Sequence, residues 1–120
     1  MNSRLVRILS RLEEEKLDGL IVSSPANISY LTKSKSRDSY LLVCKKSFVY
    51  ITDSRYTEEA KANLEKDIEI KNADGSVFKV IAQTALDLRL KRIGFEERYL
   101  SFAEHKRIEE QLKKKARLVP

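Results

Sequence analysis

Apolar positions along the chain change period several times, from the continuous runs of strands to the three-to-four spacing of helices. Residues 48–52, Phe-Val-Tyr-Ile-Thr, are all β-branched or aromatic, which favours a buried strand. Asp53 follows directly and suits a helix N-cap, because its carboxylate can accept a hydrogen bond from the free N–H of Arg55 or Tyr56. We expect a strand that runs straight into a helix, with these three residues at the carboxyl edge of a sheet.

The first helix is predicted from apolar residues that recur at helical spacing, namely Leu5, Ile8, Leu9 and Leu12. Asn2 or Ser3 can cap its start, and Asp18-Gly19 supplies a residue with positive φ at which we expect the chain to leave the helix. Residues 32–39 contain no apolar side chain and predict a surface loop.

The remaining pattern predicts strands at 20–22, 40–45, 68–70, 92–95 and 116–119 and helices at 27–31, 77–88 and 101–112. The strands at 40–45 and 48–52 are two residues apart, which suits an antiparallel hairpin. The later helical crossovers favour parallel strands. The order of elements therefore predicts one α/β domain with a mixed β-sheet flanked by helices.

Composition limits the classes of protein that this chain can represent. Its 120 residues suit one domain, and no apolar run approaches the ~20 residues of a membrane span. The arginines near the start interrupt the apolar positions, which is unlike a signal peptide, so we expect a cytoplasmic protein without a membrane partner. Cys44 is the single cysteine and lies within a strand pattern, which predicts a buried, inert thiol.

The formal net charge of +6 arises from 24 basic and 18 acidic side chains. The densest basic cluster is 113–117, a pattern typical of an exposed helix end. No aromatic residue interleaves with it, so we expect no nucleic-acid partner. A basic nucleic-acid binder is kept as a hypothesis next to the two that are given below. Salt-sensitive retention on DNA would favour it.

Most residue combinations that could support catalysis or metal binding are missing from the sequence. His105 is the only histidine and falls on an apolar stripe, so packing is favoured over catalysis, and a zinc cage is excluded. The acidic clusters 13–15 and 96–97 do not suit an acid–base pair, and three isolated glycines form no phosphate-binding loop. The polar residues near presumed strand ends serve either as caps and turns or as a contact surface: Asn27, Tyr30, Asp53, Arg55 and Tyr56.

Four segments together carry a resemblance to a known family: Leu-Asp-Gly-Leu-Ile-Val at 17–22, Pro-Ala-Asn-Ile-Ser-Tyr-Leu-Thr at 25–32, Tyr-Ile-Thr-Asp-Ser-Arg-Tyr at 50–56 and Ile-Gly-Phe-Glu at 93–96. In this order and spacing the chain resembles the N-terminal domain of the creatinase, prolidase and aminopeptidase P family. The resemblance implies a ribonuclease-H-like mixed α/β fold for residues 1–120, without catalytic residues or metal ligands. It also implies a separate C-terminal pita-bread catalytic domain, absent from this chain, with two divalent metal ions: manganese, cobalt or zinc.

The same resemblance implies a part of a metal-dependent Xaa-Pro peptidase, with that catalytic domain, a second copy and a proline-containing peptide as partners. In the family, the loop after the Tyr-Leu-Thr motif can lean over the neighbouring subunit's active site. The candidates for substrate access or dimer contacts are Asn27, Tyr30, Lys33, Lys35, Arg37, Asp38, Asp53, Arg55 and Tyr56. The alternative is a peptidase-like module without activity that binds protein partners. The choice between an aminopeptidase and a dipeptidase stays open.

Overall fold

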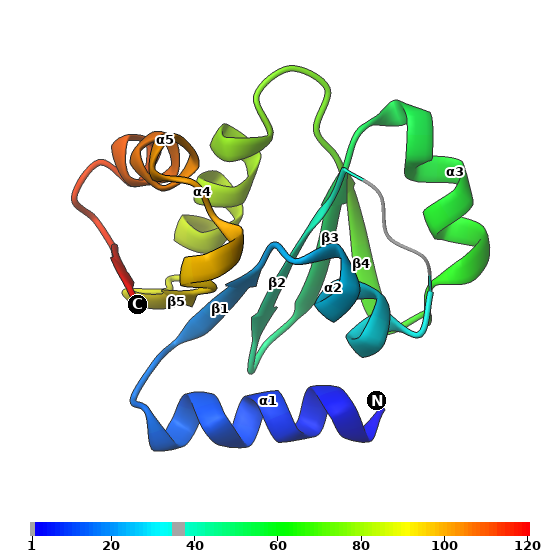
Figure 1. The fold of residues 1–120 in the computed structure, drawn as a ribbon, viewed down its shortest axis with the longest axis horizontal. Coiled ribbons are helices and arrows are strands. Elements are labelled where there is room, and N and C mark those ends of the chain that lie inside the picture. Colours follow the sequence, from blue (N-terminus) through cyan, green and yellow to red (C-terminus); the bar gives the residue numbers. More distant parts are fainter. Residues whose placement is uncertain (1, 35–37) are drawn as a thin grey trace.

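The computed structural model describes residues 2–34 and 38–120 as a β-sheet with helices on both faces (Figure 1). The helices are α1 (Ser3–Glu14), α2 (Pro25–Thr32), α3 (Ser54–Asn63), α4 (Val77–Asp87) and α5 (Phe102–Leu112), with the 3-10 helix η1 (Glu97–Tyr99) before α5. The strands are β1 (Gly19–Val22), β2 (Tyr40–Cys44), β3 (Phe48–Thr52), β4 (Ile68–Asn72), β5 (Arg92–Phe95) and β6 (Arg117–Val119).

The sheet has the strand order β4-β3-β2-β1-β5-β6. Strand β2 runs antiparallel to both of its neighbours, whereas β1 with β5, β3 with β4 and β5 with β6 are parallel pairs. The predicted mixed sheet and hairpin are therefore confirmed. One edge of the sheet collects the carboxyl ends of the five parallel strands and the start of β2, and this edge is called the carboxyl edge below.

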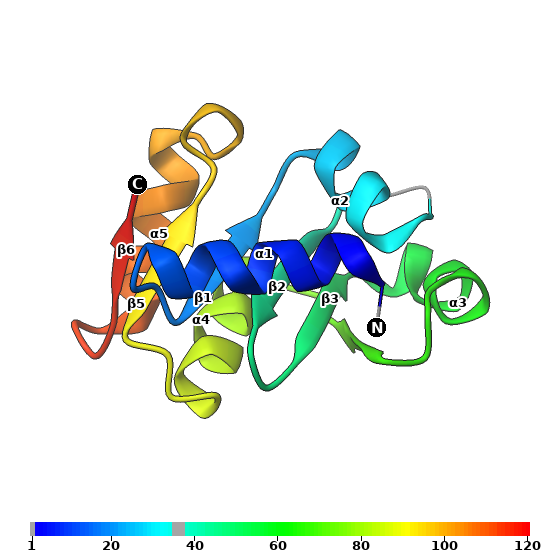
Figure 2. The same ribbon diagram turned by 90° about the horizontal axis from the view of Figure 1, so that it is seen from below.

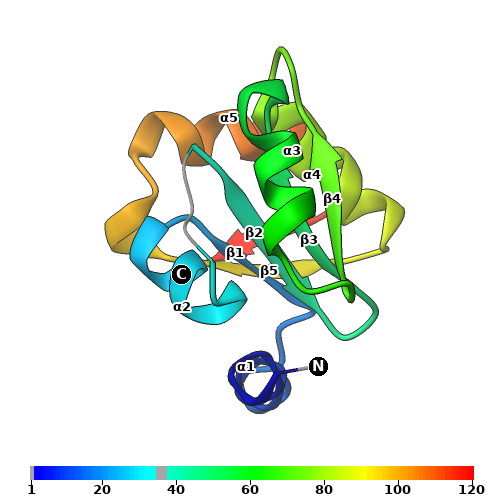
Figure 3. The same ribbon diagram turned by 90° about the vertical axis from the view of Figure 1, so that its right-hand side faces the viewer.

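Two apolar layers hold the helices against the sheet. Successive side chains of a strand point to opposite faces, so Leu42 belongs to the cluster under α4 and α5, and Leu41 to the cluster under α1, α2 and α3. Figure 2 shows α1 lying across the strands, and Figure 3 shows it end-on, on the side of the sheet away from α5. Leu5 of α1 and Leu112 of α5 are both fully buried.

The predicted end of the first helix was wrong. Asn2 is its N-cap, as one of the two candidates, and its side chain accepts a hydrogen bond from Leu5 N at 2.9 Å. The helix ends at Glu14, and Lys16, not Gly19, takes a positive φ, of 57°. Gly19 lies in β1, where a Cβ would come within 3.2 Å of the Val43 carbonyl oxygen. This glycine therefore permits β1 and β2 to pack closely.

The predicted surface loop at 32–39 is too long at both ends. Thr32 closes α2 and is 1% exposed, and its hydroxyl donates to the Ile28 carbonyl at 2.7 Å. Ser39 is also buried. Lys35 and Arg37 lie outside the described residues, so the predictions for them stay predictions.

Several local predictions are confirmed. The helix predicted over 101–112 is α5, and Ser101 and Glu104 form a reciprocal cap at its start. Cys44 is 1% exposed, and its Sγ lies 3.4 Å from the Ser47 carbonyl oxygen. His105 packs edge-to-face on Phe95, with ring centroids 4.9 Å apart. Across the described ranges, no helix has the length and apolar content to span a membrane.

Candidate functional site

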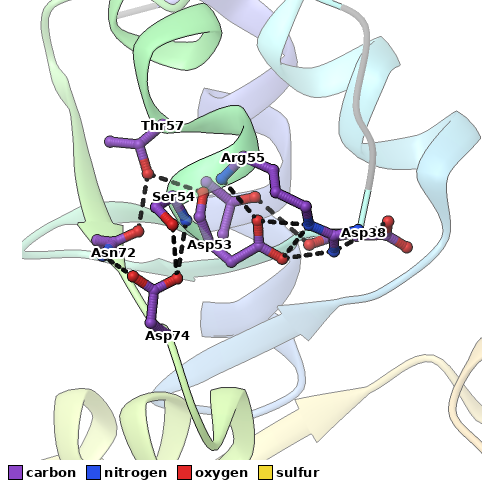
Figure 4. Close-up of polar contacts among 8 residues, drawn as sticks. Asp38, Asp53, Ser54, Arg55, Thr57, Asn72 and Asp74 are labelled. Carbon is purple, nitrogen blue, oxygen red and sulfur yellow. Dashed lines mark hydrogen bonds and ion pairs between the residues drawn. The ribbon is translucent and has the colours of Figure 1, made fainter.

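Asp53 lies between β3 and α3 and is the N-cap of α3, as the sequence predicted. Its Oδ1 accepts a hydrogen bond from Arg55 N at 3.0 Å, which satisfies one of the free N–H groups of the first helical turn (Figure 4). The Arg55 guanidinium then folds back on the same carboxylate, with Nε 3.0 Å from Oδ1 and Nη2 2.6 Å from Oδ2. This two-point contact fixes the direction of a long side chain at an exposed edge.

Arg55 also reaches Asp38, which precedes β2. Its Nη2 lies 3.5 Å from Asp38 Oδ2, and the Thr52 hydroxyl donates to the Asp38 carbonyl at 3.4 Å. The guanidinium carbon lies 5.0 Å from the centre of the Tyr56 ring. Four predicted candidates therefore meet at the carboxyl edge, although residues 38 and 53–56 are separated in sequence by the β2–β3 hairpin. Asp38 and Arg55 remain mostly exposed, at 65% and 63%.

A second group, which the sequence analysis missed, extends this site along the edge to β4. Asp74 Oδ1 accepts from both the N–H and the hydroxyl of Ser54 at 3.0 Å, and its Oδ2 accepts from Asn72 Nδ2 at 3.0 Å. The Thr57 hydroxyl lies 2.9 Å from Asn72 Oδ1 (Figure 4). Because β4 is parallel to β3, residues that follow it reach the start of α3, and the polar turn after residue 72 was the available signal.

The charges of this edge are set by those contacts. The Arg55 side chain holds the pKa of Asp53 below its usual value, and the Asp53 carboxylate raises the pKa of Arg55. The Ser54 N–H likewise holds the pKa of Asp74 below its usual value. All three groups are therefore charged at neutral pH. They line an open hollow of about 530 Å³, with Tyr40 in its wall.

This hollow presents three carboxylates, those of Asp38, Asp53 and Asp74, to one guanidinium. It suits the recognition of charged ends of a small molecule or peptide by hydrogen bonds and ion pairs. Within residues 2–34 and 38–120, no group of three or more His, Cys, Asp or Glu side chains converges to hold a metal ion. Asp53 and Asp74 instead direct their oxygens at Arg55, Ser54 and Asn72. The carboxylates of Asp53 and Asp74 are therefore engaged by donors of the protein itself.

Asn27 lies in a different cluster of the same edge. Glu96, just after β5, accepts from Ser23 N at 2.7 Å and Ser24 N at 2.9 Å through Oε1, and its Oε2 accepts from Asn27 Nδ2. Asn27 therefore fixes the turn between β1 and α2. The sequence alone predicted no contact for Glu96, which belongs there only to the acidic cluster 96–97 and to the 93–96 motif.

Tyr30 and Lys33 stand apart from both clusters. Arg4 of α1 lies 4.0 Å above the Tyr30 ring, which is 52% exposed. Lys33 is the exposed C-cap of α2, with a φ of 59°. Near η1, two further aromatic side chains are exposed, Tyr99 and Phe102.

Comparison with known proteins gives a match to the family described as the Creatinase/Prolidase N-terminal domain over residues 4–120. The chain is also 31% identical over 86 residues to the uncharacterized peptidase YqhT of Bacillus subtilis (strain 168), an alignment that covers 72% of this chain and 24% of YqhT.

Solved structures have the same fold. An Xaa-Pro aminopeptidase from Streptococcus pyogenes is 31% identical, with a TM-score of 0.87, over 97% of this chain and 87% of that chain. The N-terminal domain of the cytoplasmic peptidase PepQ from Mycobacterium tuberculosis H37Rv is 24% identical, with a TM-score of 0.90, over 99% of this chain and 92% of that one. These matches confirm the predicted fold class.

An Xaa-Pro dipeptidase from Bacillus anthracis has the same fold, with a TM-score of 0.89 and 24% identity. That match covers 98% of this chain and only 32% of the dipeptidase chain. The present chain thus spans about a quarter of the length of YqhT and about a third of that of the dipeptidase.

Proposed function

Because this chain belongs to the creatinase/prolidase N-terminal domain family, we propose that it is the non-catalytic N-terminal domain of a metal-dependent Xaa-Pro peptidase. In this role it shapes substrate access and contributes to dimer contacts. Its surface for both tasks is the carboxyl edge around Asp38, Asp53, Arg55 and Tyr56. The chemistry of turnover belongs to a C-terminal catalytic domain of the same polypeptide.

One observation carries this proposal, the double engagement of Arg55 by Asp53 and Asp38. The Asp53 contact is bidentate at 2.6–3.0 Å, whereas Asp38 is held more loosely at 3.5 Å. A partner carboxylate can therefore replace Asp38 on the guanidinium while Asp53 keeps the side chain in place. The C-terminal carboxylate of a short peptide and an acidic side chain of a second subunit both suit that exchange.

The other parts of the proposal concern the longer polypeptide. We place two divalent metal ions, manganese, cobalt or zinc, in its catalytic domain and not in this chain, whose described residues offer no suitable donor set. A proline-containing peptide is the substrate, the assembly is a homodimer, and the location is cytoplasmic. Lys35 and Arg37 are retained as access candidates, because they lie in sequence between the Tyr-Leu-Thr motif and Asp38.

The test uses the complete polypeptide and Xaa-Pro peptides with added Mn²⁺. We expect metal-dependent cleavage, with a KM several-fold higher in Arg55→Ala and an almost unchanged kcat, because the arginine binds and does not react. Arg11→Ala is the matched control, since Arg11 is an exposed arginine of α1 whose partner, Glu15, lies 3.8 Å away. Absence of any metal-dependent cleavage would remove the proposal.

The second candidate function is an inactive peptidase-like module that binds protein partners. The exposed aromatic residues near η1 favour it, since Phe102 is 81% exposed and Tyr99 is 54% exposed. The sequence that follows residue 120 distinguishes the two functions. Loss of the metal-binding carboxylates and histidine there would favour the binding module.

A further inference from the structure

A hollow of about 980 Å³ lies at the opposite edge of the sheet, between the end of α5, strand β6 and the start of β5. Six basic and two acidic side chains line it, a formal net charge of +4. The basic residues are Lys91, Arg92, Lys113, Lys114, Lys115 and Arg117. A large share of the chain's net charge of +6 is therefore gathered at one concave place.

Acidic groups of the described residues offset these cations only in part. Among the described residues, none of the six side-chain cations has a carboxylate oxygen within 4.0 Å, although Glu109 and Glu110 line the same hollow. Asp18 Oδ2 accepts from the backbone N–H groups of Lys91 and Arg92 at 2.9 Å and is the acidic group next to these two residues. Elsewhere Arg11, Arg55 and Lys61 do have such partners. The hollow thus presents an excess of positive charge whose side chains form no ion pair among the described residues.

The fold also brings like charges together at this place. Arg92 of β5 is the register partner of Arg117 of β6, and adjacent strands are only about 4.8 Å apart. Arg117 N donates to the Lys91 carbonyl at 2.9 Å, so the backbone of a third basic residue adjoins the pair, and Arg92 Nε donates to the Lys16 carbonyl at 3.1 Å. Like charges on neighbouring strands repel each other, and an anion between them would remove that repulsion.

The helix dipole explains only part of this arrangement. Lysines after the last turn of α5 interact favourably with its negative end, which accounts for 113–115. It does not account for Arg92 and Arg117, which lie in strands, or for Lys91, which directly precedes β5. The same dipole weakens the binding of a singly charged anion, so a ligand must contact several cations at once.

We propose that this hollow binds a multiply charged anion made of linked phosphates. The lining contains no aromatic side chain, so recognition acts through charge and not through base stacking. The volume exceeds that of a single phosphate and accommodates a chain of them. The proposal is independent of the peptidase function, because the hollow and the Arg55 site lie at opposite edges of the sheet.

The test is calorimetric titration of this chain with inorganic tripolyphosphate at low salt. We expect saturable binding that is much tighter than that of orthophosphate and weakens as NaCl rises. Lys91→Gln with Lys115→Gln should weaken it about fivefold or more. Both residues have ordinary backbone φ values, so folding should persist, as circular dichroism would verify. Lys114→Gln with Arg117→Gln is the second test variant.

The matched control is Lys61→Gln with Lys66→Gln, which removes the same charge beside α3 and β4 at the far end of the sheet. Its affinity should stay within about twofold of the original. Titrations with ATP and with a single-stranded DNA oligonucleotide identify the natural source of the phosphates, a nucleotide or a nucleic acid. Absence of saturable tripolyphosphate binding, or equal weakening in the control variant, would overturn the proposal.

Discussion

Glu96 shows how much one side chain can organise at the carboxyl edge. Its carboxylate joins β5 to the β1–α2 turn by accepting from two backbone N–H groups and from Asn27. The contacts span about 70 residues of sequence, since Ser23 and Ser24 lie 73 and 72 positions away. No local pattern predicts such a contact, and a glutamate in a turn looks like a solvated charge.

We predict that Glu96→Gln lowers the free energy of unfolding by about 1–2 kcal/mol, because hydrogen bonds to a charged acceptor are stronger than those to an amide. The amide nitrogen would also face the Asn27 amide. Urea denaturation measures the loss. Glu97→Gln, at the exposed next position, should change stability by less than about 0.5 kcal/mol. Equal losses in both variants would contradict the role given to Glu96.

Asp18 gives a pH-dependent prediction. Its Oδ2 accepts from Arg92 N and Lys91 N at 2.9 Å, and these bonds hold its pKa below the usual value. The folded pKa is thus lower than the unfolded one, so its stabilisation is present above the unfolded pKa of about 3.9 and is lost as pH falls through the folded value.

Asp18→Asn should therefore lower the free energy of unfolding at pH 7 by about 0.5–1 kcal/mol, a small value because the group is largely exposed. Urea midpoints measured from pH 7 to pH 2.5 should differ most above the unfolded pKa of about 3.9 and draw together as pH falls below it. A difference that stays constant over this range would show that the charge of Asp18 does not matter.

At the scale of elements, helix α5 is defined at its start by a reciprocal cap. Ser101 Oγ accepts from Glu104 N at 3.1 Å, and Glu104 Oε1 accepts from Ser101 N at 2.9 Å. Ser101→Ala should cost about 1 kcal/mol of folding free energy, whereas Ser101→Thr keeps the hydroxyl and should cost little. Thermal unfolding of both variants tests the prediction. It fails if alanine and threonine have the same effect.

Elements of this kind could be predicted from the sequence, because their causes are local. The run 48–52, the cap at Asp53 and the reciprocal cap of α5 each depend on residues within four positions of one another. Helix ends without a strong signal could not be predicted. Lys16 takes a left-handed conformation that glycine usually adopts, whereas Gly19 lies inside the sheet.

Only about half of the candidate site could be predicted from the sequence. Asp53, Arg55 and Tyr56 are adjacent in sequence and were expected together at a strand end. The contributions of Asp38 and Asp74 depend on strand order, because β2 and β4 flank β3 on its two sides. That order is decided by the packing of both faces of the sheet, which no single segment encodes.

At the scale of the whole molecule, one sheet separates two apolar clusters that share its strands. Leu5 and Leu112 are both fully buried and lie on opposite faces. We predict that Leu5→Ala and Leu112→Ala each lower the free energy of unfolding by about 2–4 kcal/mol. Each variant should unfold in a single transition, because a small domain with shared strands is cooperative.

Urea unfolding followed by circular dichroism and by tyrosine fluorescence tests that expectation. The two signals should give the same midpoint in both variants. Separate midpoints in Leu5→Ala would show that α1 and its apolar layer come apart before the layer under α4 and α5 does.

Because Cys44 is buried, its reaction with a thiol reagent can report on opening of the sheet. This is the only thiol of the chain, and it sits at the end of the central strand β2, nearly without contact with water. A thiol reagent can reach it only after the sheet opens at this end of β2, next to the β2–β3 turn. The labelling rate in native buffer therefore counts openings of the middle of the sheet, without any substitution or attached dye.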